Sequence, residues 1–486
     1  MDVVAKTKYL FYVITSVLLS IAFSGTILLS GCVLTKQTPK VRLPEDIPST
    51  WKAGTNNDQK LSIASSLIDL IGEEQLLRQL IDEAMENNPN LKATALRLKA
   101  SGYLTSVSRS RLLPRINAEF LKGRDNQGVN AETGKQTTTD SHRLSLGMSW
   151  ELDIWGRLAN EYTASKQAVL AQECEYLHVR DALAVRVIQA WIEQITILRS
   201  LAITKERMTV LKRIETVLME RYKYGIGNLD ELSTAKSRTK IAKADLSALN
   251  AALFQTTRKL EVLLGRYPRG ELFSDAHLPM IISPPVTTPV TVLLNRPDIQ
   301  AALARVEAAV NLSSAADKAM LPNLSLSGQI FKQAVHLNSL KSATGSWSIL
   351  GSLFQPLFEG GRIISESRAR RTEADAALME LHEVVLKALK EAGDAFGVER
   401  DLAVQSQALK IAAHESEKSS RYYEERYRQG LDTIQNLLMA KEQEMSVRIR
   451  LNEVVAGRLA NRVDLAMALG VGLNDEPAMP TGDRTP

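Results

Sequence analysis

Four segments of the chain alternate apolar and polar residues with a period of two. Between residues 143 and 153 every second position is apolar, and the positions between are mostly small or polar. The same alternation runs through residues 114–123, 323–333 and 346–354, where Leu350 breaks it once. A period of two predicts β-strands whose two faces differ in polarity. Such strands are typical of a membrane barrel with water inside, but an ordinary half-buried antiparallel sheet alternates identically.

The residues between the first two strands form a polar segment. Residues 124–140 are rich in glycine, asparagine and threonine. This composition predicts a hairpin loop, which would be extracellular if the strands form a barrel.

A long stretch without helix breakers follows each pair of strands. After Trp155 no proline occurs until Pro268, and Gly225 and Gly227 are the only helix-ending signals before Gly265. A single long helix followed by a shorter one is therefore expected in this half of the chain.

The expected helix lengths match in a specific way. Long helices over 155–222 and 361–427 would each span ~100 Å at 1.5 Å per residue. Shorter helices over 89–113 and 229–264 would together span ~90–95 Å. Two short helices stacked end to end thus equal one long helix, which is the geometry of a cylinder wall.

The helices carry apolar stripes that need partners. Apolar residues recur at spacings of three and four, as at Leu246, Leu249, Leu253, Leu260 and Leu264, and at Leu378, Leu381, Val385, Ala388 and Ala392. This spacing predicts coiled-coil packing. A soluble coiled-coil rod would show the same stripes, but it would not explain the four strands.

The chain contains an internal duplication. Pro89 and Pro114 have the same separation as Pro297 and Pro322. Further matching segments keep one register without a gap: 155–157 with 360–362, 220–225 with 425–430, and 263–265 with 468–470. Two copies of one structural unit are therefore expected, each reading helix, strand, strand, long helix, helix.

The repeats suggest the domain organisation of the chain. We expect the first repeat at 65–265 and the second at 296–471. Residues 266–295 would link them, and residues 472–486 would form a disordered tail.

The N-terminus reads as an export and anchoring signal. Lys6 and Lys8 precede an apolar stretch that ends in Leu-Ser-Gly before Cys32. This pattern predicts a signal peptide at 1–31 whose cleavage leaves Cys32 as a lipidated first residue, followed by an extended tether at 32–64. An uncleaved transmembrane anchor is the alternative, since about 20 apolar residues can span a bilayer.

Composition excludes several other classes of protein. The net charge of +5 is spread over 486 residues, so no nucleic-acid-binding face is expected. The two cysteines provide no disulfide framework, and the six histidines show no metal-binding spacing. With no phosphate loop or nucleophile elbow, we expect no enzyme activity, no cofactor and no metal. Only the first ~30 residues are apolar enough to insert as a helix, which excludes a polytopic helical transporter.

Four segments together resemble the TolC-like outer membrane factor family, in its lipoprotein branch of efflux components. They are residues 150–157, 293–328, 354–362 and 426–430. The resemblance implies a mainly α-helical trimer with four strands per protomer in a shared twelve-stranded membrane β-barrel. A long periplasmic α-helical barrel would continue from it. Four strands alone leave two open edges, which hydrocarbon does not tolerate, so closure needs further chains.

The resemblance also places the narrow end of the tunnel beside two turns. These turns are Tyr222 with Gly225 and Tyr427 with Gly430. The family usually has two aspartates after the second turn, but Asn436 and Met439 take those positions here. The gate candidates are Asp230, Glu231, Asp432, Gln435, Asn436, Leu438 and Met439. An acidic collar, an apolar constriction and simple helix-terminus stabilisation all remain open.

These features together predict a passive exit duct for small toxic compounds or drugs. The duct would lie in the outer membrane of a Gram-negative bacterium, anchored by lipid and extending into the periplasm. A periplasmic adaptor would open it, and an inner-membrane pump, of the RND type by resemblance, would feed it. The outer-membrane duct of a type I protein secretion system is one alternative, and a non-conducting coiled-coil lipoprotein scaffold is another.

Overall fold

The computed structural model describes residues 66, 67, 69, 75–129, 136–272, 277, 278, 289, 292 and 295–473. The predicted signal peptide at 1–31, Cys32 and the predicted tether at 32–64 lie outside the described residues. Much of the predicted linker at 266–295 and most of the tail at 472–486 also lie outside them.

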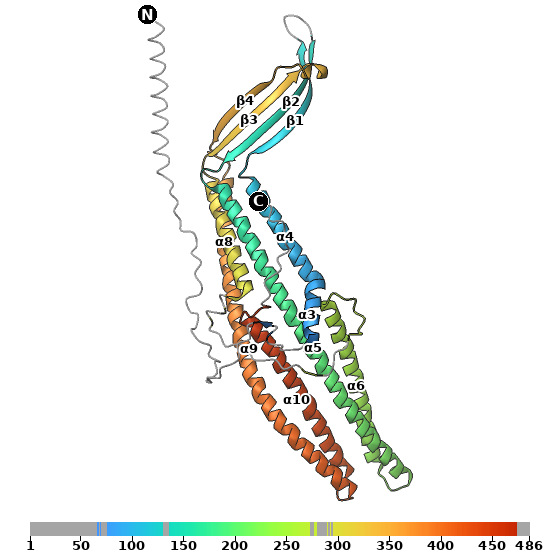
Figure 1. The fold of residues 1–486 in the computed structure, drawn as a ribbon. Helices are drawn as coiled ribbons and strands as arrows, with labels where there is room; N and C mark the ends of the chain where they lie inside the picture. The colour runs from blue at the N-terminus through green and yellow to red at the C-terminus, as the bar shows by residue number, and fades with distance from the viewer. Residues whose placement is uncertain are drawn as a thin grey trace, which may run out of the picture. The chain divides into compact units, whose positions relative to one another are not determined.

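The helices of the two halves come in pairs of equal length. α5 and α9 have 67 residues each, α6 and α10 have 35 each, and α4 and α8 have 22 each. Their bounds are Pro89–Ser110 (α4), Arg157–Lys223 (α5), Leu229–Leu263 (α6), Pro297–Lys318 (α8), Arg362–Arg428 (α9) and Ile434–Ala468 (α10) (Figure 1). The predicted duplication is confirmed, and the predicted helix ends agree to within a few residues.

One further helix was not predicted. α3, Gln75–Asn87, precedes α4 and buries Leu77, Leu80, Ile81 and Ala84. These residues follow the spacing of an amphipathic helix and pack against α5. The sequence prediction began the first helix at Pro89, the proline that has an equivalent in the second repeat, and therefore did not include this segment.

The strands form one antiparallel sheet. Its order is β1-β2-β3-β4, and the bounds are Arg115–Val129 (β1), Gln136–Leu152 (β2), Asn323–Ala334 (β3) and Ser346–Phe354 (β4). A short 3₁₀ helix, η1 (Leu337–Leu340), lies between β3 and β4. All four predicted strands are confirmed.

The predicted loop at 124–140 was too long. β1 continues to Val129 and β2 begins at Gln136, so the ladder extends well into this segment. Threonine favours extended backbone, and an ion pair of 3.2 Å between Arg124 and Asp140 joins the two strands there. Polar composition alone therefore did not mark the end of the strands.

Strand register gathers the apolar residues on one face of the sheet. Cross-strand partners on this face include Ala118 with Leu146, Leu146 with Ile330, and Ile330 with Trp347. The other face carries mostly small and polar residues, such as Ser145, Ser149, Ser325, Ser327, Gln329 and Ser348. Leu350 lies on the polar face opposite Ser327, as its break in the alternation predicted. The sheet therefore has one apolar and one polar surface over all four strands.

A compact junction joins the sheet to the long helix α5. Asp153 follows β2, and its carboxylate accepts hydrogen bonds from the backbone N–H groups of Leu158 (3.0 Å) and Ala159 (2.7 Å). The indole of Trp155 donates to the carbonyl of Pro322 at 2.7 Å. The carboxylate caps the helix N-terminus while the indole ties the second half of the chain to the first.

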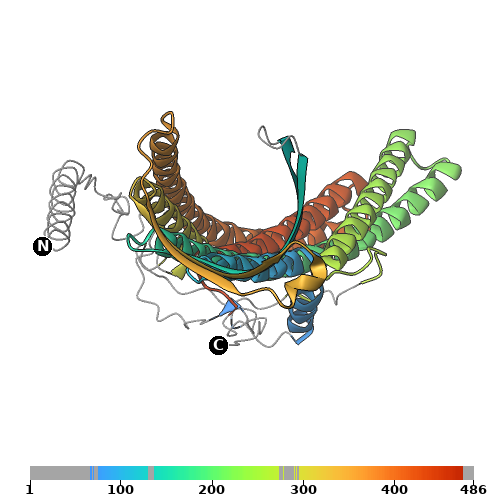
Figure 2. The same ribbon diagram turned by 90° about the horizontal axis from the view of Figure 1, so that it is seen from above.

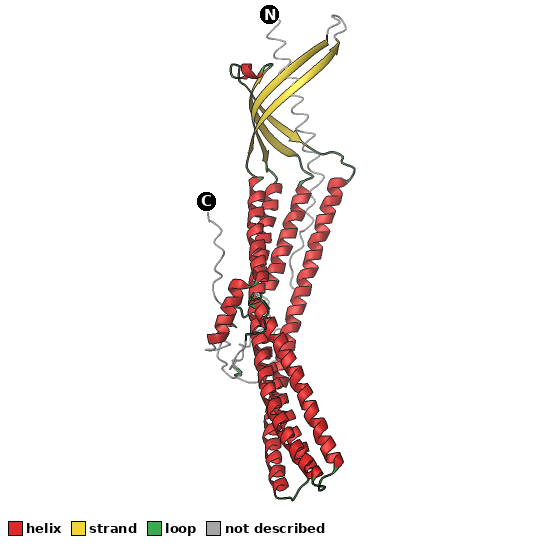
Figure 3. Cartoon of the chain, turned by 90° about the vertical axis from the view of Figure 1, so that its right-hand side faces the viewer, coloured by secondary structure: helices red, strands yellow, loops and turns green. Residues whose placement is uncertain are grey.

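α5 lies at the centre of the helical part. It packs against α4 and α6 of its own half and against α8 and α10 of the other half, whereas α9 packs mainly against α8 and α10 (Figures 1 and 3). The predicted stripe on α9 is buried at Leu381, Val385, Ala388 and Ala392, which confirms the packing expected from the spacing. No helix within the described residues has the length and apolar content to cross a membrane.

In each half, a side-chain hydrogen bond joins the two short helices. The side-chain amide of Asn88, before α4, donates to the carbonyl of Leu263 in α6 at 2.9 Å. In the second half the guanidinium of Arg296, before α8, donates to the carbonyl of Ala468 in α10 at 3.2 Å. These bonds join the start of one short helix to the end of the other, as expected for helices stacked end to end.

Candidate functional site: the helix tips

The turn between α5 and α6 lies at the end of the helices far from the sheet (Figure 1). Gly225 has φ +73°, and its N–H donates to the carbonyl of Tyr222 at 3.0 Å. The N–H of Ile226 donates to the carbonyl of Arg221 at 3.0 Å. This pair of bonds is a Schellman motif, which requires a left-handed residue that glycine supplies without strain.

The turn between α9 and α10 has the same geometry. Gly430 has φ +72°, and its N–H donates to the carbonyl of Tyr427 at 3.0 Å. The N–H of Leu431 donates to the carbonyl of Arg426 at 2.9 Å. The two sequence-predicted turns are therefore equivalent structural elements of the two repeats.

The two helices that leave these turns carry different charges. In the register of the duplication, Asp230 and Glu231 of α6 correspond to Gln435 and Asn436 of α10. The two acidic residues lie in the first turn of α6, where the helix dipole favours negative charge, and the α10 counterparts are neutral and exposed. Acidic residues thus occur in the first turn of α6 and not in that of α10.

Asp432 is bound within its own turn. Its carboxylate accepts hydrogen bonds from the side chain of Asn436 (2.7 Å), the backbone N–H of Thr433 (2.8 Å) and the guanidinium of Arg426 (3.2 Å). The Asn436 hydrogen bond, with the other two donors, holds the pKa of Asp432 below its ordinary value. Arg426 also donates to the hydroxyl of Tyr422 at 3.3 Å. We call the group of Tyr422, Arg426, Asp432 and Asn436 the tip clasp.

The two apolar gate candidates lie in different environments. Leu438 is only 1% exposed and packs in a core with Leu211, Leu218 and Leu232. Met439 is 63% exposed. Leu438 therefore holds the helices of the tip together, and Met439 is the one of these two candidates whose side chain lies at the surface.

Several charged residues that the sequence did not indicate link the helices above the tips. Arg207 of α5 contacts Asp245 of α6 at 3.0 Å and Glu442 of α10 at 3.3 Å. Arg238 of α6 also contacts Glu442, at 2.5 Å. Most of these partners are far apart in the chain, so no local pattern could have revealed them.

A further ion pair joins the two helices of the second repeat. Lys441 of α10 lies 3.0 Å from Glu424 of α9. The hydrogen bond from Lys441 and its charge lower the pKa of Glu424. The tips are therefore held by polar contacts between helices as well as by the apolar core.

The sequence model of the family described as "outer membrane efflux protein" matches residues 80–266 and 288–471 of this chain. The chain belongs to the outer membrane efflux protein family. The resemblance drawn from the sequence is thereby confirmed.

Individual members of the family are distant in sequence but similar in length and fold. Outer membrane protein OprJ of Pseudomonas aeruginosa is 26% identical over 82% of this chain and 85% of its own length. The toluene efflux pump outer membrane protein TtgF of Pseudomonas putida is 25% identical over 98% of this chain and 99% of its own. A crystal structure of a membrane protein from Pseudomonas aeruginosa superposes with a TM-score of 0.82, at 25% identity, over 89% of this chain and 99% of that one.

Proposed function

We propose that this outer membrane efflux protein is the outer-membrane channel of a tripartite efflux system in a Gram-negative bacterium. It would be a passive exit duct for small toxic compounds or drugs. The observation that carries the proposal is the sheet, which has one apolar face across all four strands and helices that continue from its ends. The named relatives include an efflux pump component for toluene, which supports small compounds as the substrate class.

The height of the apolar face fits a membrane. On β2 the face runs from Leu144 to Leu152, a span of ~27 Å at about 3.4 Å per residue. Strands of membrane barrels are tilted by ~40°, which reduces this span to roughly 21 Å, close to the ~25 Å height of the apolar band in such barrels. The polar face would then line a water-filled lumen.

The two edges of the sheet require other copies of the chain. β1 and β4 each have a single neighbouring strand within the described residues. Their unpaired N–H and C=O groups cannot be left in hydrocarbon. We propose that three copies close a twelve-stranded barrel, the number that the family resemblance implies.

The helices support the same head-to-tail assembly. α5 has α4 and α6 on one side and α8 and α10 on the other, whereas α9, its counterpart in the duplication, packs mainly against α8 and α10. By the duplication, α4 and α6 of the next copy would cover the remaining face of α9. Apolar residues are exposed on both surfaces: Met379, Leu386, Val398, Val404 and Ile411 on α9, and Leu96, Tyr103, Leu104 and Val107 on α4.

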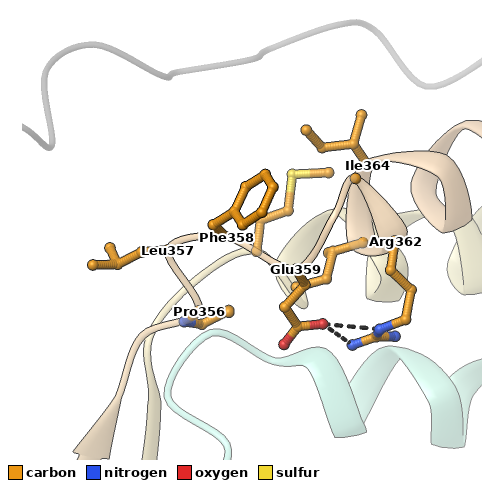
Figure 4. A pocket seen from close by; sticks show the side chains of 9 residues that line it. Pro356, Leu357, Phe358, Glu359, Arg362 and Ile364 are labelled. Atoms are coloured by element: carbon orange, nitrogen blue, oxygen red, sulfur yellow. Dashed lines mark hydrogen bonds and ion pairs between the residues drawn. The ribbon is translucent and has the colours of Figure 1, made fainter.

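The junction between β4 and α9 presents a further apolar surface for a neighbouring copy. Leu357 and Phe358 are 92% and 88% exposed, beside a cleft of about 300 Å³ that Met320 and Ile364 also line (Figure 4). Arg362 holds this turn through a hydrogen bond of 2.8 Å to Glu359. Side chains this apolar and this exposed are typical of an interface between subunits.

We propose that the helix tips form the periplasmic gate and the contact with the adaptor. Three copies of Asp230 and Glu231 would form an acidic collar, with Met439 as the apolar element beside it. Asp432 is engaged in the tip clasp and Leu438 is buried, so both would act by holding the tip rather than by lining it. Gln435 and Asn436 give the second turn a neutral surface.

The energy for export would come from partners. No motif for energy conversion occurs in the sequence, so an inner-membrane pump would drive transport through a periplasmic adaptor. We also propose that a lipid on Cys32, in the segment outside the described residues, anchors each copy in the outer membrane.

Two experiments test the function. Deletion of the gene is expected to sensitise the cell to small toxic compounds, and unchanged tolerance to all compounds tested would contradict efflux. A defect limited to the release of a secreted protein would instead favour type I secretion. Purified protein in planar bilayers is expected to give discrete conductance steps, whereas a coiled-coil scaffold would give none.

A further inference from the structure

The apolar face of the sheet becomes basic toward the hairpins. Lys122 follows Phe120 on this face of β1, and Lys332 follows Ile330 on the same face of β3. In the strand register Lys122 lies opposite His142, and Lys332 lies opposite Leu144. Along its own strand each lysine therefore lies directly beyond the apolar residues, toward the end of the sheet away from the helices.

The two lysines are exposed and lack a carboxylate partner among the described residues. The amine of Lys332 makes one hydrogen bond, of 3.2 Å, to the carbonyl of Lys341. The nearest acidic side chain on this face, that of Asp140, is paired with Arg124 at 3.2 Å. An excess of positive charge thus remains at the level of the lysines.

The basic residues lie on the convex side of the sheet. Lys332 bonds to the carbonyl of Lys341, and a ring nitrogen of His142 lies 3.2 Å from the carbonyl of Val335. These two carbonyls flank η1, which lies on the convex side of the curved sheet in Figure 2. In a closed barrel the convex side faces lipid, so the lysines would point outward and not into the lumen.

An aromatic residue lies next to this level. Trp347 of β4 pairs with Ile330, which is two residues along the strand from Lys332, and it is largely exposed on the apolar face. Tryptophan concentrates where hydrocarbon meets the headgroup region of a membrane. The lysines therefore lie at the height of the headgroups, on the side opposite the periplasmic helices.

We propose that Lys122 and Lys332 form a site for the phosphate groups of the phosphorylated glycolipid in the outer leaflet. The two residues are two strands apart, a lateral separation of about 10 Å, so that one glycolipid with two phosphates could reach both. An ammonium group is a compact donor for phosphate, and its attraction is strong at a partly dehydrated membrane surface. The inference rests on the proposed outer-membrane location and names a lipid partner for it.

The test measures binding of purified full-length protein to diphosphorylated lipid A in detergent, by native mass spectrometry. The double variant Lys122→Gln/Lys332→Gln is expected to bind about 25-fold more weakly, since each basic residue near such a surface contributes about fivefold. Arg143→Gln is the matched control, because Arg143 lies on the polar face of β2 near the same level. This control is expected to bind like the wild type.

Two further measurements separate the outcomes. Lys122→Arg/Lys332→Arg keeps the charge and is expected to retain binding, and higher salt should weaken binding by the wild type. Equal binding of the double glutamine variant, or equal binding of dephosphorylated lipid A, would overturn the proposal. Conductance is recorded on the same preparations. Conducting channels that are indifferent to phosphate would reject the lipid site alone, whereas absence of conductance would reject the proposed function.

Discussion

Two glycines that follow helices of the first repeat share a left-handed backbone but have different surroundings. Gly225 and Gly265 have φ of +73° and +75°. No heavy atom lies within 4 Å of a Cβ built on Gly225, whereas one on Gly265 would lie 2.5 Å from the carbonyl oxygen of Asn87. The first glycine is needed for its conformation alone, and the second also lets α3 approach the end of α6.

Alanine substitutions at these two glycines should therefore differ in cost. Gly225→Ala is expected to destabilise the protein by about 1 kcal/mol, the cost of a left-handed residue with a Cβ. Gly265→Ala adds a steric clash and is expected to cost about 2–3 kcal/mol or more. Urea unfolding in detergent, followed by circular dichroism, measures both. Equal losses of unfolding free energy in the two variants would mean that Asn87 moves away from the added methyl group without further cost.

The carboxylate of Glu261 makes the stability of the helical part depend on pH. Its side chain is 3% exposed and accepts hydrogen bonds from the N–H groups of Gly270 (2.7 Å), Glu271 (2.9 Å) and Leu272 (3.3 Å). Burial alone would raise the pKa of Glu261, but these backbone donors outweigh it and the pKa is lowered below the ordinary 4.5. The stability that this group contributes is therefore complete above pH 4.5 and is lost as the pH falls through the lowered pKa.

Glu261→Gln should remove this pH dependence. At pH 7 the variant is expected to be less stable by about 2 kcal/mol, because hydrogen bonds to a charged acceptor are replaced by weaker ones. The difference in unfolding free energy between the variant and the wild type should decrease only at acidic pH. Thermal unfolding between pH 3 and 7 provides the measurement, and a constant difference over that range would contradict the assignment.

At the scale of elements, regular sequence patterns predicted the strands and the long helices but missed one helix and two strand ends. The period-two alternation identified all four strands and both faces of the sheet, and the absence of breakers identified the long helices. The prediction missed α3 because it began the first helix at Pro89, and it missed the ends of β1 and β2 because their polar composition is also typical of a loop. The partners of Arg207 and Arg238 could not be read from the sequence, since they depend on how separate segments of chain come together.

The two faces of β3 should respond differently to one substitution. Ile330→Arg places a charge on the apolar face between its middle and its outer end and is expected to cost about 1–2 kcal/mol, and to reduce the amount of assembled protein in the outer membrane. Gln329→Arg, one residue away on the polar face, should assemble at the level of the wild type. Quantitative blotting of outer-membrane fractions distinguishes them, and equal losses would contradict the proposal that the apolar face contacts lipid.

The tip clasp offers a test of the gate. Asn436→Asp replaces the donor to Asp432 with a second carboxylate, which should repel Asp432 and weaken its hold on Arg426. We expect an increased open probability in single-channel recordings. Asn436→Ser removes the amide donor without adding charge and should have a smaller effect. An unchanged open probability in Asn436→Asp would mean that the tip clasp does not control gating.

For the whole molecule, the one-sided packing of α9 predicts the position of the subunit interface. Leu386→Glu places a charge on the exposed face of α9 and should leave the helices of one chain folded while the assembly dissociates. Leu386→Met, which stays apolar, is expected to assemble normally. Native mass spectrometry measures the oligomeric state, and a Leu386→Glu protein that remains assembled would place the interface elsewhere.

The unfinished edges of the sheet have a consequence for how the protein is made. A chain whose ladder ends at β1 and β4 has no complete native form at infinite dilution, since part of its hydrogen bonding belongs to its neighbours. The last step of maturation is then the association of newly exported chains. Its rate rises more steeply than the concentration of those chains. Low expression would therefore lower the yield of finished ducts out of proportion to the loss of chains.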